Sequence, residues 1–135
     1  MPQFALPSAR DGKVIDSNSF KDKALLVTFF ATWCPPCIQE VPAMISLQDE
    51  FKDKGFSVIG IAVDQGGDKA VKRLIDKMAI NYPVVMADSK VIADFGGVYG
   101  IPASFLINQH GNVVKKYPGA FPHTIFSHDI KNLFK

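Results

Sequence analysis

The two cysteines of this 135-residue chain stand three positions apart, in the stretch Cys34-Pro-Pro-Cys37. Two thiols at this spacing can interconvert between a dithiol and a disulfide. One sulfur attacks a substrate disulfide, and the other attacks the resulting mixed disulfide and releases the product. The reactive form is the thiolate, so the surroundings of the attacking sulfur must favour deprotonation. The pair therefore predicts thiol-disulfide exchange at Cys34 and Cys37.

Two other interpretations of the pair are open. A structural disulfide at this spacing would close a very short loop, which removes little entropy from the unfolded chain. A zinc site would need two further ligands, and His123 and His128 mimic the second half of a two-cysteine, two-histidine site. The stretch between the two halves is far too long for that pattern, and prolines would lie inside the metal loop. Exchange chemistry explains more of the features.

The elements beside the pair predict where each sulfur lies. The apolar run over residues 24–30 is typical of a strand buried on both faces, and apolar residues recur at helical spacing from Pro36 to about Phe51. Cys34 then stands at a helix N-terminus, where free backbone N–H groups and the positive end of the helix dipole stabilise a thiolate. We expect Cys34 to be the nucleophile. Cys37, one turn further along on the apolar side, is expected to be the sheltered resolving thiol.

Pro35 and Pro36 separate the cysteines and carry no backbone N–H. Pro36 suits the first turn of a helix, and neither proline can donate a hydrogen bond to the sulfur of Cys34. Fewer donors destabilise the thiolate, and a stiffer loop favours ring closure. Both effects predict a reducing pair.

The remaining patterns predict an α/β layer sandwich that forms one domain over residues 1–135. The order of elements is β-α-β-α-β-α, followed by a hairpin and a helix. This order implies parallel crossovers first and an antiparallel edge after them. The expected segments are two extended pieces within 3–16 around a turn at Asp11-Gly12, strands over 24–30, 56–63, 83–86, 103–107 and 113–117, and helices over 36–51, from 68, over 88–95 and from 122.

Two of the helices carry specific expectations. Asp68 is expected to cap the second helix, with Val71, Leu74, Ile75 and Met78 on its inner side. Pro122 is expected to open the last helix. The residues predicted to face inward from that helix are Ile125, Phe126, Ile130, Leu133 and Phe134.

The composition excludes several classes of function. The 15 basic and 13 acidic residues are scattered and give a net charge of +2, so nucleic acid is not an expected partner. The longest apolar run is far too short to cross a bilayer, and the first residues lack the regions of a signal peptide. A start at the beginning of a domain is compatible with an export signal or membrane anchor upstream in a full-length form.

The stretch LLVTFFATWCPPCIQEVP resembles the active-site segment of the thioredoxin superfamily, in particular its TlpA/ResA/CcmG-like branch. Residues 2–27 are similar to the N-terminal hairpin of that branch, and residues 56–80 are similar to its extra β-α insertion. The stretch GVYGIPASFLINQHGNVV resembles its cis-proline strand and hairpin. The resemblance implies a thioredoxin fold: a central mixed β-sheet flanked by helices, with an N-terminal β-hairpin and an inserted β-α unit.

The resemblance also implies a function. Members of this branch are typically exported or membrane-tethered disulfide reductases, and many keep the cysteines of apocytochrome c reduced for haem attachment. Protein or peptide disulfides are the implied substrates, and an upstream thiol donor, such as a membrane thiol reductase, must reset the pair. We expect an extracytoplasmic location, a monomer, and no metal or organic cofactor.

Glu40 completes the pattern C-x-x-C-x-x-E-x-P and matches the active-site glutamate of the branch. It lies one turn after Cys37 on a largely apolar side of the helix. Partial desolvation there raises the pKa of a carboxyl and allows it to exchange protons with the cysteine pair. The alternative is that an acid early in a helix only complements the helix dipole. Pro42 matches the helix-kinking proline of the family.

Ile101-Pro102 resembles the cis-proline site that faces the cysteines in this superfamily. A cis bond there leaves the Ile101 backbone free to pair with an extended substrate peptide; the alternative is a trans proline that opens an edge strand. Trp33 matches the family tryptophan that covers the disulfide, although it could be an ordinary core residue. Trp33, Pro35, Pro36, Ile101 and Pro102 are the expected substrate-binding residues, and a loop of Gly96, Gly97, Tyr99 and Gly100 is expected to shape a groove or form an ordinary turn.

Two departures bear on neighbouring functions. Thr28 stands where ordinary cytosolic thioredoxins carry a buried aspartate, which argues against a general thioredoxin. The N-terminal half also resembles peroxiredoxins, but a thiol peroxidase needs a threonine three residues before its reactive cysteine, and Ala31 is there. A redox-inert module that binds metal through its thiols is the alternative from another class.

Overall fold

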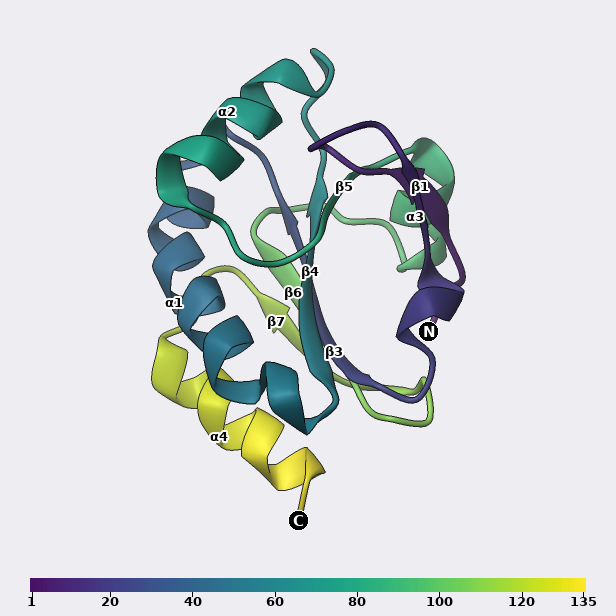
Figure 1. The fold of residues 1–135 in the computed structure, drawn as a ribbon, viewed down its shortest axis with the longest axis vertical. Coiled ribbons are helices and arrows are strands. Elements are labelled where there is room, and N and C mark those ends of the chain that lie inside the picture. Colours follow the sequence, from purple (N-terminus) through teal and green to yellow (C-terminus); the bar gives the residue numbers. More distant parts are fainter.

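A computed structural model describes residues 1–135 and contains a five-stranded mixed sheet in the order β5-β4-β3-β6-β7 (Figure 1). The strands are β3 (Ala24–Phe30), β4 (Phe56–Ala62), β5 (Val84–Met86), β6 (Ala103–Ile107) and β7 (Val113–Pro118). The β3, β4 and β5 strands are parallel, whereas β6 runs antiparallel to both β3 and β7. Parallel crossovers followed by an antiparallel edge are confirmed, as is the thioredoxin fold.

Helices cover both faces of the sheet. The helices α1 (Pro35–Phe51), α2 (Lys69–Met78) and α4 (His123–Leu133) lie on one face, to the left in Figure 1. On the other face lie α3 (Ser89–Asp94) and the hairpin of β1 (Ala5–Pro7) and β2 (Val14–Asp16), with the 3-10 turn η1 (Ser17–Phe20) after it. An isolated bridge from Ser8 to Val85 joins the hairpin to the edge of the sheet.

The sheet separates two hydrophobic cores because side chains of β3 alternate between its faces. Leu26 and Phe30 join the larger core with α1, α2 and α4, while Val27 and Phe29 join the smaller core with α3 and the hairpin. Every residue of β3 and of β4 is buried, as the continuous apolar runs predict. No helix of the structure has the length and apolar content that a bilayer crossing requires.

Two expectations about helices are wrong. Asp68 occupies the position before α2, but its side chain makes no capping hydrogen bond, because its backbone is already helical (φ −88°, ψ −10°) rather than extended. Ile125 faces outward from α4 and is 40% exposed. The side of α4 that meets α1 and the sheet carries Phe126, Ser127 and Ile130, and Ile125 lies to one side of this stripe.

The topology gathers the ends of the parallel strands at one edge. The carboxyl ends of β3, β4 and β5 meet there, and the loop from β3 to α1 carries the cysteines across this edge. At the far end of α1, a short 3-10 turn, η2 (Lys52–Lys54), is followed by Gly55 with φ 76°, so the chain turns into β4. The fold therefore places the cysteine pair where the loops of several strands converge.

Gly60, in the middle of β4, is expected to be intolerant of a side chain. A Cβ at this position would lie 3.1 Å from Cε1 of Phe30, at the end of the strand that leads to the cysteines. We expect Gly60→Ala to lower the free energy of unfolding by about 1–3 kcal/mol through overpacking, measured by urea denaturation. Gly66→Ala is the matched control, because a Cβ at Gly66 meets nothing within 4 Å. Equal stabilities of the two variants would contradict the close packing at Gly60.

Candidate functional site

Cys34 and Cys37 form a disulfide at the N-terminus of α1. Cys34 is the N-cap residue, with extended backbone, and its Sγ accepts a hydrogen bond from the Cys37 N–H at 3.3 Å. The first two helical positions are Pro35 and Pro36, which have no N–H to offer. The sulfur thus receives the first N–H that the helix can direct at it. The predicted strand-to-helix position of the pair is confirmed.

Burial does not distinguish the two sulfurs in the disulfide form, because Cys34 is 5% exposed and Cys37 is 3% exposed. Their neighbours differ instead. The Sγ of Cys34 lies 3.8 Å from the carbonyl oxygen of Ile101, on the other side of the site. Cys37 faces a small interior cavity that Glu40 also lines. Cys34 is therefore the sulfur that lies beside the start of β6.

The Ile101–Pro102 peptide bond is cis, as predicted, and precedes the first residue of β6. Pro102 is buried, while Ile101 is half-buried. A mostly apolar groove of about 360 Å³ adjoins the bond; its lining comprises Gly97, Val98, Tyr99, Gly100, Ile101, Pro102, Ala103, Phe105, Pro118 and Gly119. The glycine-rich loop thus forms one wall of a groove.

Exposed rings lie at the groove and next to the cysteines in the chain. Trp33, the residue before Cys34, is 68% exposed, and Tyr99 is 98% exposed. Pro35 and Pro36 are exposed as well. Apolar rings that water reaches on a folded domain are available to contact another chain. Trp33 is therefore not an ordinary core residue.

Glu40 is buried on α1, with 5% of its surface exposed. Its Oε2 accepts a hydrogen bond from the N–H of Phe121 at 3.0 Å. Burial raises the pKa of Glu40 from 4.5 to about 7, and the hydrogen bond from Phe121 opposes part of that rise. The position of Glu40, one turn after Cys37 on an apolar side of the helix, predicts this rise of the pKa. A carboxyl with this pKa can both accept and donate a proton near neutral pH.

Hydroxyl groups line or adjoin the cavity of Cys37 and Glu40. Thr28 lies beside the cavity of Cys37 and Glu40, and its Oγ1 accepts a hydrogen bond from the Ser104 hydroxyl at 3.0 Å. Tyr82 lines the same cavity. Burial raises the pKa of Tyr82 well above its usual range, and the negative charge of Glu40 adds to the rise, so this phenol stays neutral.

Sequence reasoning missed three groups at the site. Tyr82 lies between predicted elements, and the N–H of Phe121 is a backbone group that no side-chain pattern indicates. Asp64 follows β4, and its carboxylate accepts hydrogen bonds from the N–H of Thr32 at 3.1 Å and from the Thr32 hydroxyl. Asp64 could have been found, because it is a polar residue at the carboxyl end of a buried strand.

The histidines lie away from the cysteines. His123 lies on α4 beside Glu50, with Nε2 3.4 Å from the carboxylate, while His128 contacts Asn132 and His110 is exposed in a turn. No three His, Cys, Asp or Glu side chains are grouped as metal ligands would be.

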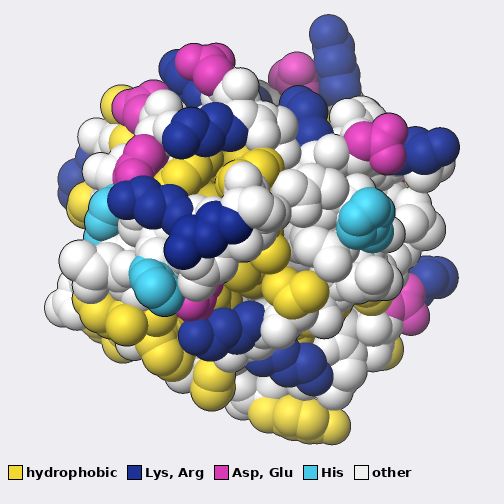
Figure 2. Space-filling view, turned by 90° about the horizontal axis from the view of Figure 1, so that it is seen from below, with side chains coloured by type: hydrophobic (Ala, Val, Ile, Leu, Met, Phe, Trp, Pro, Cys, Tyr) yellow, Lys and Arg dark blue, Asp and Glu magenta, His cyan; other side chains and the backbone are white.

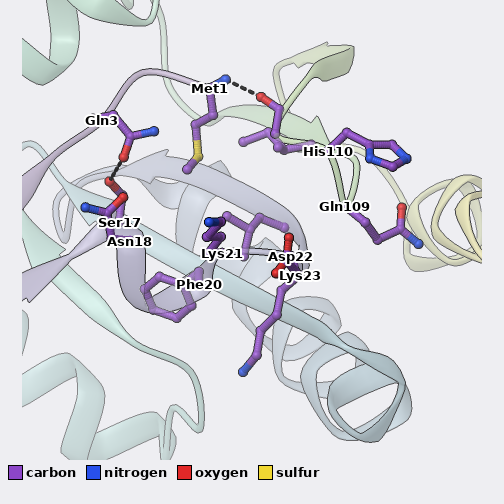
Figure 3. Close-up of a pocket in the computed structure, with 13 residues that line it drawn as sticks. Met1, Gln3, Ser17, Asn18, Phe20, Lys21, Asp22, Lys23, Gln109 and His110 are labelled. Atoms are coloured by element: carbon purple, nitrogen blue, oxygen red, sulfur yellow. Dashed lines mark hydrogen bonds between the residues drawn. The ribbon is translucent and has the colours of Figure 1, made fainter.

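A second concavity lies at the opposite end of the sheet (Figure 3). This cavity of about 490 Å³ is bordered by the start of β3 and the end of β6, with Phe20, Lys21 and Lys23 among its lining residues. Seen from that end, apolar side chains lie among Lys and Arg side chains, with acidic groups around them (Figure 2). None of the predicted site residues is there.

Comparisons with known proteins agree with this geometry. A family model described as Redoxin matches residues 1–134. The thiol-disulfide oxidoreductase ResA of Bacillus subtilis is 35% identical over 135 residues, which cover 99% of this chain and 73% of the relative. ResA of Bacillus thuringiensis subsp. konkukian is 35% identical over 118 residues, or 87% of this chain and 67% of the relative. A crystal structure of a thiol:disulfide interchange protein of the thioredoxin family from Chlorobium tepidum superposes with a TM-score of 0.91 at 39% identity, covering 99% of this chain and 94% of the other.

The raised pKa of Glu40 predicts a specific dependence of stability on pH. Between pH 4.5 and about 7 the folded protein keeps the Glu40 proton that the unfolded chain has lost. Stability contributed by this group therefore falls as pH rises through that window. Across that window the free energy of unfolding of the oxidised wild type should fall by about 2 kcal/mol relative to that of Glu40→Gln, after allowance for solvent screening.

Urea denaturation at several pH values measures this difference. Gln39→Ala, on the exposed side of the same helix, is the control, because it removes no titratable group and its stability relative to wild type should not depend on pH. A constant difference between wild type and Glu40→Gln would show that Glu40 has an ordinary pKa.

Proposed function

We propose that this chain, which belongs to the redoxin family and is a thiol-disulfide oxidoreductase, works as a reductant of protein disulfides. The observation that carries the proposal is the cap of α1. Pro35 and Pro36 leave the Cys37 N–H as the hydrogen-bond donor to the Cys34 sulfur. A thiolate with few donors is less stabilised than one at an unobstructed helix N-terminus, and a less stabilised dithiol gives up its electrons more readily.

The reaction begins with Cys34 in its thiolate form. Its sulfur attacks one sulfur of the substrate disulfide, the substrate S–S bond breaks, and the departing substrate sulfur takes a proton. Cys37 then loses its proton and attacks the Cys34 sulfur of the mixed disulfide. The second substrate sulfur leaves as a thiol. Two electrons have passed to the substrate, and the chain holds the Cys34–Cys37 disulfide seen in the structure.

Glu40 is the proposed acceptor of the Cys37 proton. Both residues line one small cavity, and a carboxyl with a pKa of about 7 is partly ionised at neutral pH. A base with a pKa near the working pH combines availability with driving force. Glu40 then returns the proton when an upstream donor reduces the disulfide again.

The substrate peptide is proposed to lie extended along the start of β6. The backbone of Ile101 would pair with it, as in a short strand addition, which brings a substrate sulfur beside Cys34. Trp33, Pro35, Pro36 and Pro102 would contact the peptide from the sides. The observations that support this arrangement are the exposure of Trp33, the residue before Cys34, and the apolar groove that Ile101 and Pro102 line.

Substrate and location follow from the family resemblance. We propose oxidised CxxCH segments of apocytochrome c as the physiological class of substrate, reduced outside the cytoplasm by a monomeric domain formed by residues 1–135. Protein disulfides persist in such oxidising compartments, so a reductant there must be reset by an upstream thiol donor, such as a membrane thiol reductase. A thiol peroxidase is not proposed, because Ala31 stands where that activity would need a threonine.

The midpoint potential of the cysteine pair tests the direction of the reaction. Titration in defined thiol/disulfide buffers, followed by the fluorescence of Trp33, should give a midpoint near or below about −270 mV, the value for thioredoxin. A variant with both cysteines changed to serine should show no transition. A midpoint near about −120 mV would make the chain an oxidant and end the reductant proposal.

The roles of the two cysteines can be separated by trapping. With an oxidised CxxCH peptide, reduced Cys37→Ser should accumulate a stable mixed disulfide, because the resolving thiol is missing. Cys34→Ser should form little of this adduct under the same conditions. Mass spectrometry of the unreduced products measures both. Equal trapping by the two variants would contradict Cys34 as the nucleophile.

A further inference from the structure

The three residues 119–121, between β7 and α4, connect two parts of the proposed site through backbone hydrogen bonds. The N–H of Gly119 donates to the carbonyl oxygen of Pro102 at 2.8 Å. The N–H of Phe121 donates to Oε2 of Glu40 at 3.0 Å. One short segment therefore contacts both the cis-proline that adjoins the substrate groove and the buried carboxyl beside Cys37.

We propose that residues 119–121 are a positioning element that holds the Glu40 carboxyl in place and ties it to the strand end that receives the substrate peptide. The inference rests on the proposed function, since it gives Glu40 its proton-transfer role and Pro102 its place beside the substrate.

The groove end of the segment is open to a bound peptide. Pro118 and Gly119 line the apolar groove together with the residues around Ile101 and Pro102. Gly119 has φ 86°, and a Cβ there would meet nothing within 4 Å. A peptide that pairs with the start of β6 therefore approaches the backbone at Gly119. Any shift of Pro102 on binding reaches Gly119 through their hydrogen bond.

The other end of the segment controls a buried carboxyl that has few partners. The Phe121 N–H is the hydrogen-bond donor to Glu40, and the titratable groups that share the cavity are Cys37 and Tyr82. Thr28 of β3 also lines the cavity, and its hydroxyl does not titrate. An N–H that points at a carboxylate favours its ionised form, the form that can take the Cys37 proton. Loss of this bond raises the pKa of Glu40 further, so a smaller fraction of the carboxyl is ionised and able to act as a base.

The segment is anchored on both sides, so that a displacement at one end is passed on. Tyr117 is buried, and its hydroxyl donates to Asp129 of α4 at 2.7 Å. The ring of Phe121 packs edge-on against Tyr117 at 5.3 Å and lies near Phe126 at 6.2 Å between centroids. Packed aromatic rings leave the segment little freedom to absorb a shift locally.

An NMR titration of the reduced protein between pH 5 and pH 9 tests the element without changing it. The amide signal of Phe121 should move with a midpoint near the Glu40 pKa of about 7, and that of Gly119 should follow with the same midpoint. Both movements should vanish in Glu40→Gln, while Gly111, in the remote hairpin turn, should not follow Glu40 in either protein. If the Phe121 signal does not move with the Glu40 midpoint, residues 119–121 do not position Glu40. If the Gly119 signal does not, the segment does not connect Glu40 to Pro102.

A pair of variants at one position tests the consequence for chemistry. Phe121→Pro removes the N–H, whereas Phe121→Leu keeps it and changes only the ring. The rate at which Cys37 resolves a mixed disulfide should rise with pH, and its midpoint should lie about one pH unit higher in Phe121→Pro, a tenfold weaker acid. Phe121→Leu should keep the midpoint of the wild type. A midpoint that moves equally in both variants would assign the effect to packing and overturn the proposal.

The two experiments separate this inference from the proposed function. If the wild type reduces no disulfide, the reductant proposal fails while the amide titration still decides whether residues 119–121 position Glu40. If Phe121→Pro does not fold, the same titration decides the point. If folded Phe121→Pro reduces disulfides and its resolution rate has the pH midpoint of the wild type, the reductant proposal stands and the positioning element is rejected.

Discussion

The site depends on the junction at which β3 ends and α1 begins. A helix N-terminus leaves backbone N–H groups without partners, and the Cys34 sulfur occupies the position that satisfies one of them. Two prolines remove the N–H groups of the first two helical positions, so the stabilisation that the sulfur receives is limited to one bond. This constraint limits how far the Cys34 sulfur is stabilised. The other elements bring the Ile101 carbonyl and the Glu40 carboxyl to the cysteine pair.

The buried acid is the second feature of the site, and its cost is visible in its pKa. A carboxyl in an apolar cavity favours its neutral form, so Glu40 reduces stability at neutral and alkaline pH. In place of an acid on the central strand, Thr28 and Ser104 form a neutral hydroxyl pair. A single ionisable carboxyl then faces Cys37, which avoids repulsion between two buried negative charges. The chain keeps this unfavourable group beside Cys37, where the proposed reaction moves a proton.

Much of the fold could be predicted because the relevant signals are local. Continuous apolar runs identified β3 and β4, and turn residues bounded the hairpins. The errors arose where a local pattern competes with tertiary geometry. Asp68 has the residue type of a cap but a helical backbone, and Ile125 has the residue type of a core position but lies beside the stripe that meets α1. Residue type alone does not report either circumstance.

The amino-acid sequence by itself determined the cysteine pair, its place at a helix N-terminus and the acid one turn later, because all three lie within a few residues of one another along one strand and one helix. The resemblance placed Ile101-Pro102 opposite the cysteines, and only the tertiary structure decided which atoms meet there. The carbonyl of Ile101 beside Cys34, the Phe121 N–H on Glu40 and the Asp64 carboxylate on Thr32 join residues far apart in the chain. The first two contacts end on a backbone carbonyl and a backbone N–H, which a pattern of side-chain types does not report, and all three form only when distant segments pack together.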